Sequence, residues 1–165
     1  AQYGALFDTI SICLSKGLGA PIGSILLGSK AHIAKALRIR KLLGGAMRQI
    51  GFLAAAAIYA LDHHVERLAD DHLKAKEIGR VLESASYVTK VEPIETNIII
   101  FYVDENIGSD HFIQKMKSKN ILLTPMGEGR IRIVTHLDYT DEMHGVLLKE
   151  LKENQSSRSN FANSV

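Results

Sequence analysis

The alternation of strand-like and helix-like runs after residue 86 constrains the fold more than any other feature. Four short runs rich in β-branched and aromatic residues predict strands. They cover residues 87–91, 97–103, 121–124 and 130–135. Apolar residues recur at helical spacing over 109–119 and 141–153, so the order is β-β-α-β-β-α. This order predicts a small α+β unit whose antiparallel sheet is covered by helices.

The first half of the chain has a different pattern. Residues 6–14 and 22–27 are short apolar runs that predict strands on either side of a glycine-rich turn. Ser29 is a suitable N-cap, and the apolar residues of 30–43 recur at helical spacing until two glycines end the run. We therefore expect two strands followed by a helix.

Two further helices are expected before residue 86. Residues 47–61 are apolar on all sides, which predicts a deeply buried helix. Asp62 is the expected N-cap of a third helix, which runs to about residue 84 with a single apolar stripe. The polar, small residues after 153 predict a disordered tail.

Charge and composition argue against several classes of protein. The net charge of the 165 residues is +2, and the basic residues of 30–41 lack interleaved aromatic residues, so we expect no nucleic acid partner. The longest apolar run is far shorter than the roughly 20 residues that span a bilayer, so we expect no membrane segment. Cys13 lies in an apolar run, where we expect it to be buried, and a single cysteine suits the cytoplasm.

Lys16 stands at a turn where the backbone must bend closely. In SICLSKGLGAP it is followed by Gly17, Gly19 and Pro21. Glycines let a backbone pass close to a planar group, and a lysine held on a fixed turn can bond covalently to an aldehyde. Ser15 adds a hydroxyl and an N–H that suit a phosphate oxygen. A surface loop with a solvated lysine explains this short pattern equally well.

The longer context of Lys16 resembles one enzyme family. FDTISICLSKGLGAPIGSILLGS, followed by RIRKLLGGAMRQIGFLAAAAIYAL, resembles the low-specificity L-threonine aldolases, which are pyridoxal 5'-phosphate (PLP) enzymes of fold type I. The resemblance covers about residues 6–150 and implies an α/β fold. Residues 1–85 would be the C-terminal part of the PLP-binding large domain of the aspartate-aminotransferase-like fold, and residues 86–153 a small α+β domain. Residues 154–165 would form the tail.

The resemblance assigns roles to particular residues. Lys16 matches the family lysine that bonds covalently to PLP. Arg132, in RIRIVTHLD, matches the arginine that binds the substrate carboxylate, a task that suits a planar guanidinium. We expect Arg130 to be a solvated neighbour on the same strand face, and His136 to be a hydrogen-bonded structural histidine.

The segment GGAMRQ, residues 44–49, is implied to lie near the active site at a subunit interface. Arg48 is the candidate for a contact with the PLP phosphate or with the neighbouring subunit, and a structural ion pair is its alternative. Lys41 matches a lysine near the active-site entrance and is a candidate for substrate binding.

The activity implied by the resemblance is the cleavage of L-threonine or L-allo-threonine to glycine and acetaldehyde. It belongs to threonine catabolism and glycine biosynthesis and is carried out by homotetramers built from dimers. The N-terminal half of a complete member supplies a group that stacks on the PLP ring, a phosphate loop and an aspartate for the pyridine nitrogen. The chain begins AQYGALFDT, without an initiator Met or a secretory pattern, so we expect the true N-terminus to lie elsewhere or to have been removed.

Two alternatives stay open at this point. The 165 residues could be a catalytically inactive interaction module that pairs with a complete subunit through the GGAMRQ segment. A related PLP-dependent β-eliminating lyase could also share this scaffold. Because the N-terminal half of the site is absent, we expect the isolated chain to bind PLP weakly and to show no aldolase turnover.

A cluster of histidines and acids follows the apolar helix. It consists of His63, His64, Asp70, Asp71 and His72. Metal sites on helices need converging ligands at i, i+4 spacing with supporting groups, and this cluster does not offer them. We therefore expect a solvated polar face.

Overall fold

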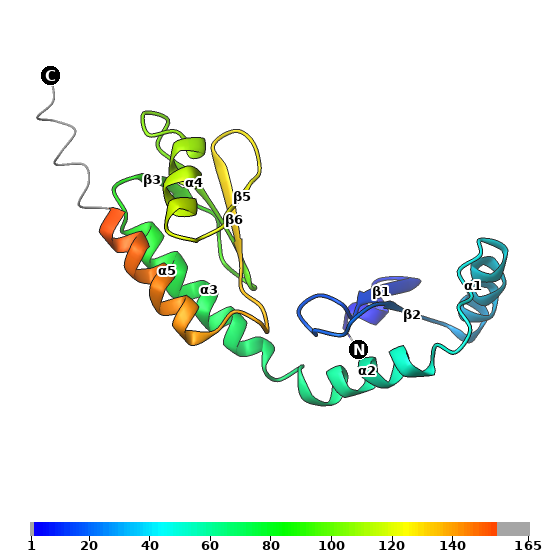
Figure 1. Cartoon of the computed structure of the whole chain (residues 1–165). Helices are drawn as coiled ribbons and strands as arrows, with labels where there is room; N and C mark the ends of the chain where they lie inside the picture. The colour runs from blue at the N-terminus through cyan, green and yellow to red at the C-terminus, as the bar shows by residue number, and fades with distance from the viewer. Residues whose placement is uncertain (1, 155–165) are drawn as a thin grey trace, which may run out of the picture. The chain divides into compact units, whose positions relative to one another are not determined.

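The computed structural model describes residues 2–154, which form two units that divide between Leu68 and Ala69 (Figure 1). The expected disordered tail lies outside the described residues, except for Asn154. The boundary expected at residue 85, between a cofactor-binding domain and a small domain, stays a prediction. The helix before that boundary, α3 (Leu68–Glu83), belongs to the second unit except for its first residue.

The first unit pairs two short strands and adds two helices. After a 3₁₀ turn at Tyr3–Ala5, β1 (Thr9–Cys13) runs antiparallel to β2 (Ser24–Gly28), with Ser11 opposite Leu26. Helix α1 (Lys30–Leu42) begins where the sequence predicts. The Ser29 side chain caps it, because its Oγ accepts a hydrogen bond from the His32 N–H at 3.2 Å.

Helix α2 (Gly51–His63) corrects two expectations. It begins at Gly51 rather than at 47, because Gln49 has a left-handed φ of 54°, which a right-handed helix does not allow. It is mostly exposed, with Phe52 at 85% and Ile58 at 59%, because the described part of this unit covers only the side that carries Ala57 and Ala60. Asp62 lies within α2, and its side chain forms no capping hydrogen bond with the other residues of 2–154.

The second unit has the predicted element order. Its elements are α3 (Leu68–Glu83), β3 (Val88–Val91), β4 (Ile98–Val103), α4 (Ser109–Ser118), β5 (Thr124–Pro125), β6 (Arg130–Val134) and α5 (Asp141–Glu153). The strands form one antiparallel sheet in the order β3-β4-β6-β5. Strand β5 is only two residues long, because Ile121 and Leu123 pack against the core instead of pairing. The Thr140 side chain caps α5 as predicted.

One face of this sheet makes the core of the second unit. Along β4 and β6 alternate residues are buried, and Ile99, Phe101 and Ile131 have no exposed surface. They pack against apolar residues of α3, α4 and α5, and Figure 1 shows α3 and α5 lying side by side. Because side chains alternate along a strand, the residues between them lie on the opposite, open face.

A buried tyrosine joins the start of the sheet to the last helix. The Tyr87 hydroxyl donates a hydrogen bond of 2.9 Å to the Leu151 carbonyl, and its ring stacks on Phe112. Burial raises the pKa of Tyr87 far above its ordinary value, so the hydroxyl stays protonated and remains a donor.

Replacing Tyr87 by Phe is expected to lower the free energy of unfolding by about 1–3 kcal/mol, because a buried carbonyl loses its partner. Tyr102→Phe is the matched control. Its hydroxyl bonds to the Glu92 carboxylate on the open face, where water can replace it, so the loss should be smaller. Urea unfolding followed by circular dichroism measures both variants, and equal losses would contradict this account of Tyr87.

Candidate active site

The turn that carries Lys16 is closed by backbone hydrogen bonds. The Gly19 N–H donates to the Lys16 carbonyl at 2.8 Å, and the Ala20 N–H donates to the Leu14 carbonyl at 3.0 Å. The Leu14 N–H donates in turn to the Gly23 carbonyl at 2.9 Å. Gly19 has a φ of 69°, which glycine adopts without strain. The position of Lys16 is therefore set by a tight, bonded loop.

The same turn is packed against α2. Leu14, Leu18 and Ala20 are buried and form an apolar cluster with Ala57 and Ala60. The alanines have short side chains, so the turn can approach the helix closely. Because its apolar neighbours face this cluster, Lys16 itself is exposed.

Gly17 lies in close packing contact with Leu68. A Cβ atom at this position would lie 3.1 Å from Leu68 Cδ2, closer than ordinary contact. The sequence alone relates the glycines of this turn to a nearby planar ligand. Within the chain, a side chain at residue 17 would also require the Leu68 side chain to shift by a few tenths of an ångström.

His64 makes a contact that the sequence did not predict. Its Nδ1 lies 2.6 Å from the Leu18 carbonyl oxygen, and since a carbonyl only accepts, Nδ1 donates. The expectation of a solvated polar face is wrong here, and wrong also for Asp71, which is 3% exposed. No signal local to His64 indicates this bond, because its partner is 46 residues away.

Lys41 and Arg48 lie on either side of the glycines between α1 and α2. Both side chains are exposed, and neither forms a hydrogen bond or ion pair with another residue of 2–154. The N-cap of α2, Ile50, offers no capping side chain. The structural ion pair considered for Arg48 is therefore not formed within the described chain.

In the second unit, Arg132 lies on the open face of the sheet. It is exposed, it pairs with Ile100 of β4 and Thr124 of β5 in the strand register, and its guanidinium has no partner among the described residues. Arg130 differs, because its guanidinium lies 3.1 Å from the Glu128 carboxylate. The expectation that Arg130 is only a solvated neighbour stays a prediction, and Arg132 is available for a ligand.

The end of β6 is anchored by polar residues that the sequence did not single out. The Asn97 side-chain amide donates to the Thr135 carbonyl at 2.7 Å, and the Thr135 hydroxyl donates to the Asp71 carbonyl at 2.7 Å. His136, the next residue, is exposed, and its Nδ1 accepts from the Asp138 N–H at 3.2 Å. The structural role expected for His136 agrees with this bond.

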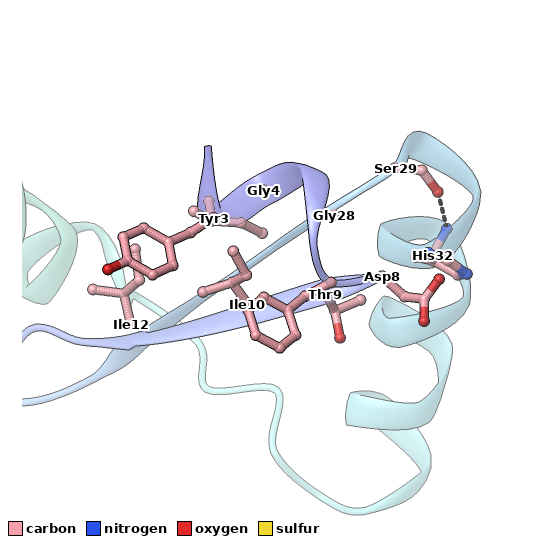
Figure 2. A pocket seen from close by; sticks show the side chains of 11 residues that line it. Tyr3, Gly4, Asp8, Thr9, Ile10, Ile12, Gly28, Ser29 and His32 are labelled. Atoms are coloured by element: carbon pink, nitrogen blue, oxygen red, sulfur yellow. Dashed lines mark hydrogen bonds between the residues drawn. The ribbon is translucent and has the colours of Figure 1, made fainter. Parts of the chain in front are cut away.

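A separate pocket of about 680 Å³ lies along the first unit (Figure 2). Figure 2 shows Ile10 and Ile12 of β1 near Tyr3, with Asp8 and His32 towards the start of α1. Its lining is mostly apolar, and the Asp8 carboxylate would repel a phosphate. None of the residues proposed for PLP or substrate lines this pocket.

The remaining expectations concern cysteine, metals and membranes. Cys13 is exposed, so the expectation of burial is wrong; both faces of the two-stranded sheet are largely open in this chain. Across residues 2–154, no group of three or more His, Cys, Asp or Glu side chains is placed to hold a metal ion. Over the same residues, no helix has the length and apolar character required to cross a bilayer.

The side chains around the Lys16 turn fit PLP chemically. Lys16 offers an exposed amine for an aldehyde, and Ser15 an exposed hydroxyl for a phosphate oxygen. Within the described chain neither side chain is engaged by another residue. The Arg48 guanidinium is also free, but Arg48 precedes the first turn of α2, whereas the Lys16 turn packs on the second half of that helix. This set of donors suits a molecule that carries both an aldehyde and a phosphate.

Comparison with known proteins places the chain in a family. The family model described as beta-eliminating lyase matches residues 1–106, and the chain belongs to this family. It is 42% identical to the low specificity L-threonine aldolase of Escherichia coli over 135 residues, which is 82% of this chain and 39% of that protein. The chain thus spans well under half of the length of this relative.

Solved structures confirm the expected fold class. Serine palmitoyltransferase of Sphingomonas wittichii superposes with a TM-score of 0.69 at 15% identity, over 96% of this chain and 41% of that one. A variant of the lyase C-DES, with glycine covalently linked to its PLP cofactor, matches with a TM-score of 0.50 at 21% identity, over 62% of this chain and 28% of that one. The chain therefore has the α/β architecture of the fold type I enzymes, with its small α+β unit.

Enlarging Ala60, which is 1% exposed, is expected to disturb the Lys16 turn. Ala60→Leu places a larger side chain into the cluster with Leu14 and Leu18, and overpacking of this kind costs about 1–3 kcal/mol. Ala55→Leu, on the exposed side of the same helix, is the control and should change stability by less than about 0.5 kcal/mol. Urea unfolding compares them, and an unchanged stability for Ala60→Leu would contradict the packing of the turn on α2.

Proposed function

We propose that the complete protein containing this chain is a PLP-dependent carbon–carbon lyase that cleaves L-threonine or L-allo-threonine to glycine and acetaldehyde. The observation that carries the proposal is the exposed Lys16 amine on a turn fixed by three backbone hydrogen bonds and by packing on α2. Membership of the beta-eliminating lyase family and the 42% identity to an L-threonine aldolase support this assignment.

Three residues of the first unit are proposed to hold PLP. Lys16 would hold PLP covalently through its aldehyde, and the Ser15 hydroxyl would donate to a phosphate oxygen. The Arg48 guanidinium contributes a charge-assisted hydrogen bond to the phosphate or to a neighbouring subunit. When bound, PLP supplies an electron sink for the bond that breaks at the substrate Cα.

Two residues are proposed to bind the substrate. Arg132 holds the substrate carboxylate with its two-pronged guanidinium, and this fixes which bond at Cα is aligned for cleavage. The free guanidinium of Arg132, in contrast to the paired Arg130, supports this choice. Lys41 attracts the anionic carboxylate at the entrance to the site.

The finer points of location and assembly are also proposals. We propose a cytoplasmic enzyme of glycine biosynthesis and threonine catabolism, which the single cysteine supports because structural disulfides are rare there. We propose a homotetramer built from dimers. The exposed apolar residues of α2, such as Phe52 and Ile58, support an assembly that covers them.

Lys16→Ala in the complete protein is expected to abolish covalent attachment of PLP. Borohydride reduction of the wild type, followed by peptide mapping, should recover the cofactor on the peptide that contains Lys16. Lys35→Ala, an exposed lysine of α1, is the control and should leave the labelling intact. Label on any other lysine of the wild type would refute the role of Lys16.

Arg132→Ala is expected to lower kcat/KM for threonine roughly 10- to 100-fold, mostly through a higher KM, since losing a charge-assisted hydrogen bond costs about 1.5–3 kcal/mol. Arg130→Ala is the control on the same strand face and should change kcat/KM by less than a factor of about three. Steady-state acetaldehyde release measures both. Unchanged kinetics for Arg132→Ala would mean that another group binds the carboxylate.

A β-eliminating lyase is the second candidate, because the matching family is named for that reaction and the lyase C-DES shares part of the fold. Product analysis separates the two. An aldolase releases acetaldehyde and glycine from threonine, whereas β-elimination from cysteine or cystine releases pyruvate and ammonia. Pyruvate without acetaldehyde would favour β-elimination, and neither product would favour the inactive interaction module.

A further inference from the structure

Among residues 2–154, one side chain hydrogen-bonds to the backbone of the Lys16 turn, and it comes from the end of α2. The His64 Nδ1–H donates to the Leu18 carbonyl at 2.6 Å, across 46 residues of sequence. Leu18 is two residues beyond Lys16, and it is buried, so its carbonyl has restricted access to water. The three backbone hydrogen bonds that close the loop use the carbonyls of Lys16, Leu14 and Gly23 instead. Within residues 2–154, His64 is thus the partner of the Leu18 carbonyl.

The imidazole of His64 is itself held in place. His64 is the C-cap of α2, and its backbone N–H donates to the Ala60 carbonyl at 2.9 Å. The Tyr59 ring meets the His64 ring edge-on, with centroids 5.6 Å apart at 86°. The loop is therefore restrained through an imidazole that stands at the end of a helix and contacts a tyrosine ring.

We propose that His64 is a positioning residue, which holds the Lys16 turn so that the amine faces the aldehyde of PLP. This inference rests on the proposed function of Lys16. His64 acts through the Leu18 carbonyl and contributes no atom to the covalent bond. Without this anchor the turn samples more orientations, and a smaller fraction of them places the amine for reaction.

The hydrogen bond from His64 to the Leu18 carbonyl can be tested with two substitutions, one that keeps the donor and one that removes it. Nδ1 carries the proton in the neutral and in the charged form of a histidine that donates from this nitrogen. In asparagine, the side-chain nitrogen is as many bonds from Cα as Nδ1 is in histidine. His64→Asn can therefore keep the donor, whereas His64→Leu keeps much of the bulk and loses the donor.

The experiment measures the rate at which PLP attaches to Lys16 in the complete protein. Apoprotein is mixed with PLP, samples are reduced with borohydride at intervals, and peptide mapping quantifies label on Lys16. We expect His64→Leu to slow attachment at least tenfold and His64→Asn to stay within about threefold of the wild type. His111→Leu is the control, since the His111 side chain is exposed and forms no hydrogen bond, ion pair or ring contact within residues 2–154, and it should behave as the wild type.

Amide hydrogen exchange of the apoprotein gives a readout that does not depend on PLP. We expect the Gly19 N–H, which closes the turn, to exchange at least tenfold faster in His64→Leu and to keep its protection in His64→Asn. Both measurements are made well below the thermal midpoint of each variant. If His64→Asn keeps the protection of the Gly19 N–H and the rate of PLP attachment, the effect of His64→Leu comes from the lost hydrogen bond to the turn and not from a general loss of stability.

The outcomes distinguish this inference from the proposed function. If the wild type shows no label on Lys16, the proposed function fails. Slow exchange of the Gly19 amide hydrogen in the wild type, together with faster exchange in His64→Leu, would still support the hydrogen bond from His64 as an anchor of the turn. If Lys16 is labelled equally fast in the wild type and in His64→Leu, the positioning role is wrong. A folded His64→Asn variant that loses attachment tenfold would overturn it as well, even if His64→Leu does not fold.

Discussion

Close packing between the Lys16 turn and α2 is the interaction on which the candidate active site depends. Short side chains at Ala57 and Ala60 let Leu14 and Leu18 reach the helix, and this burial fixes which side of the turn is covered. A lysine on the remaining side is exposed without needing a charged partner. A long cationic side chain in the cluster itself would have to lose its hydration, which costs several kcal/mol.

In the second unit, a sheet exposes a charged side chain at a fixed position. Burying one face of β4 and β6 under three helices leaves the alternate residues on the open face. Arg132 is presented there at a fixed place in the register, and the links from Asn97 to Thr135 and from Thr135 to Asp71 hold the end of its strand. A rigid strand is a better support for an orienting group than a loop, because its backbone has fewer accessible states.

The burial of Cys13, α2 and Asp71 differs from what the sequence predicts, and the three differences have the same cause. Periodicity located the strands, the helices and the caps Ser29 and Thr140, since these depend on neighbours within a few residues. Burial depends on what else the chain brings to a surface, so Cys13 and the apolar helix α2 were wrongly expected to be covered. Asp71, in contrast, was expected to be exposed and is buried, because residues from distant parts of the second unit surround it.

The sequence by itself determined the order of elements, the glycine-rich turn around Lys16 and the strand face of Arg132, because each is written in residues that are near one another. Tertiary structure alone decided that Gly17 contacts Leu68, that His64 holds the Leu18 carbonyl, and that Thr135 holds the Asp71 carbonyl. These features need a chain that returns to itself after tens of residues. Hydrogen bonds of that kind follow from three-dimensional packing, and no local pattern of residue types specifies them.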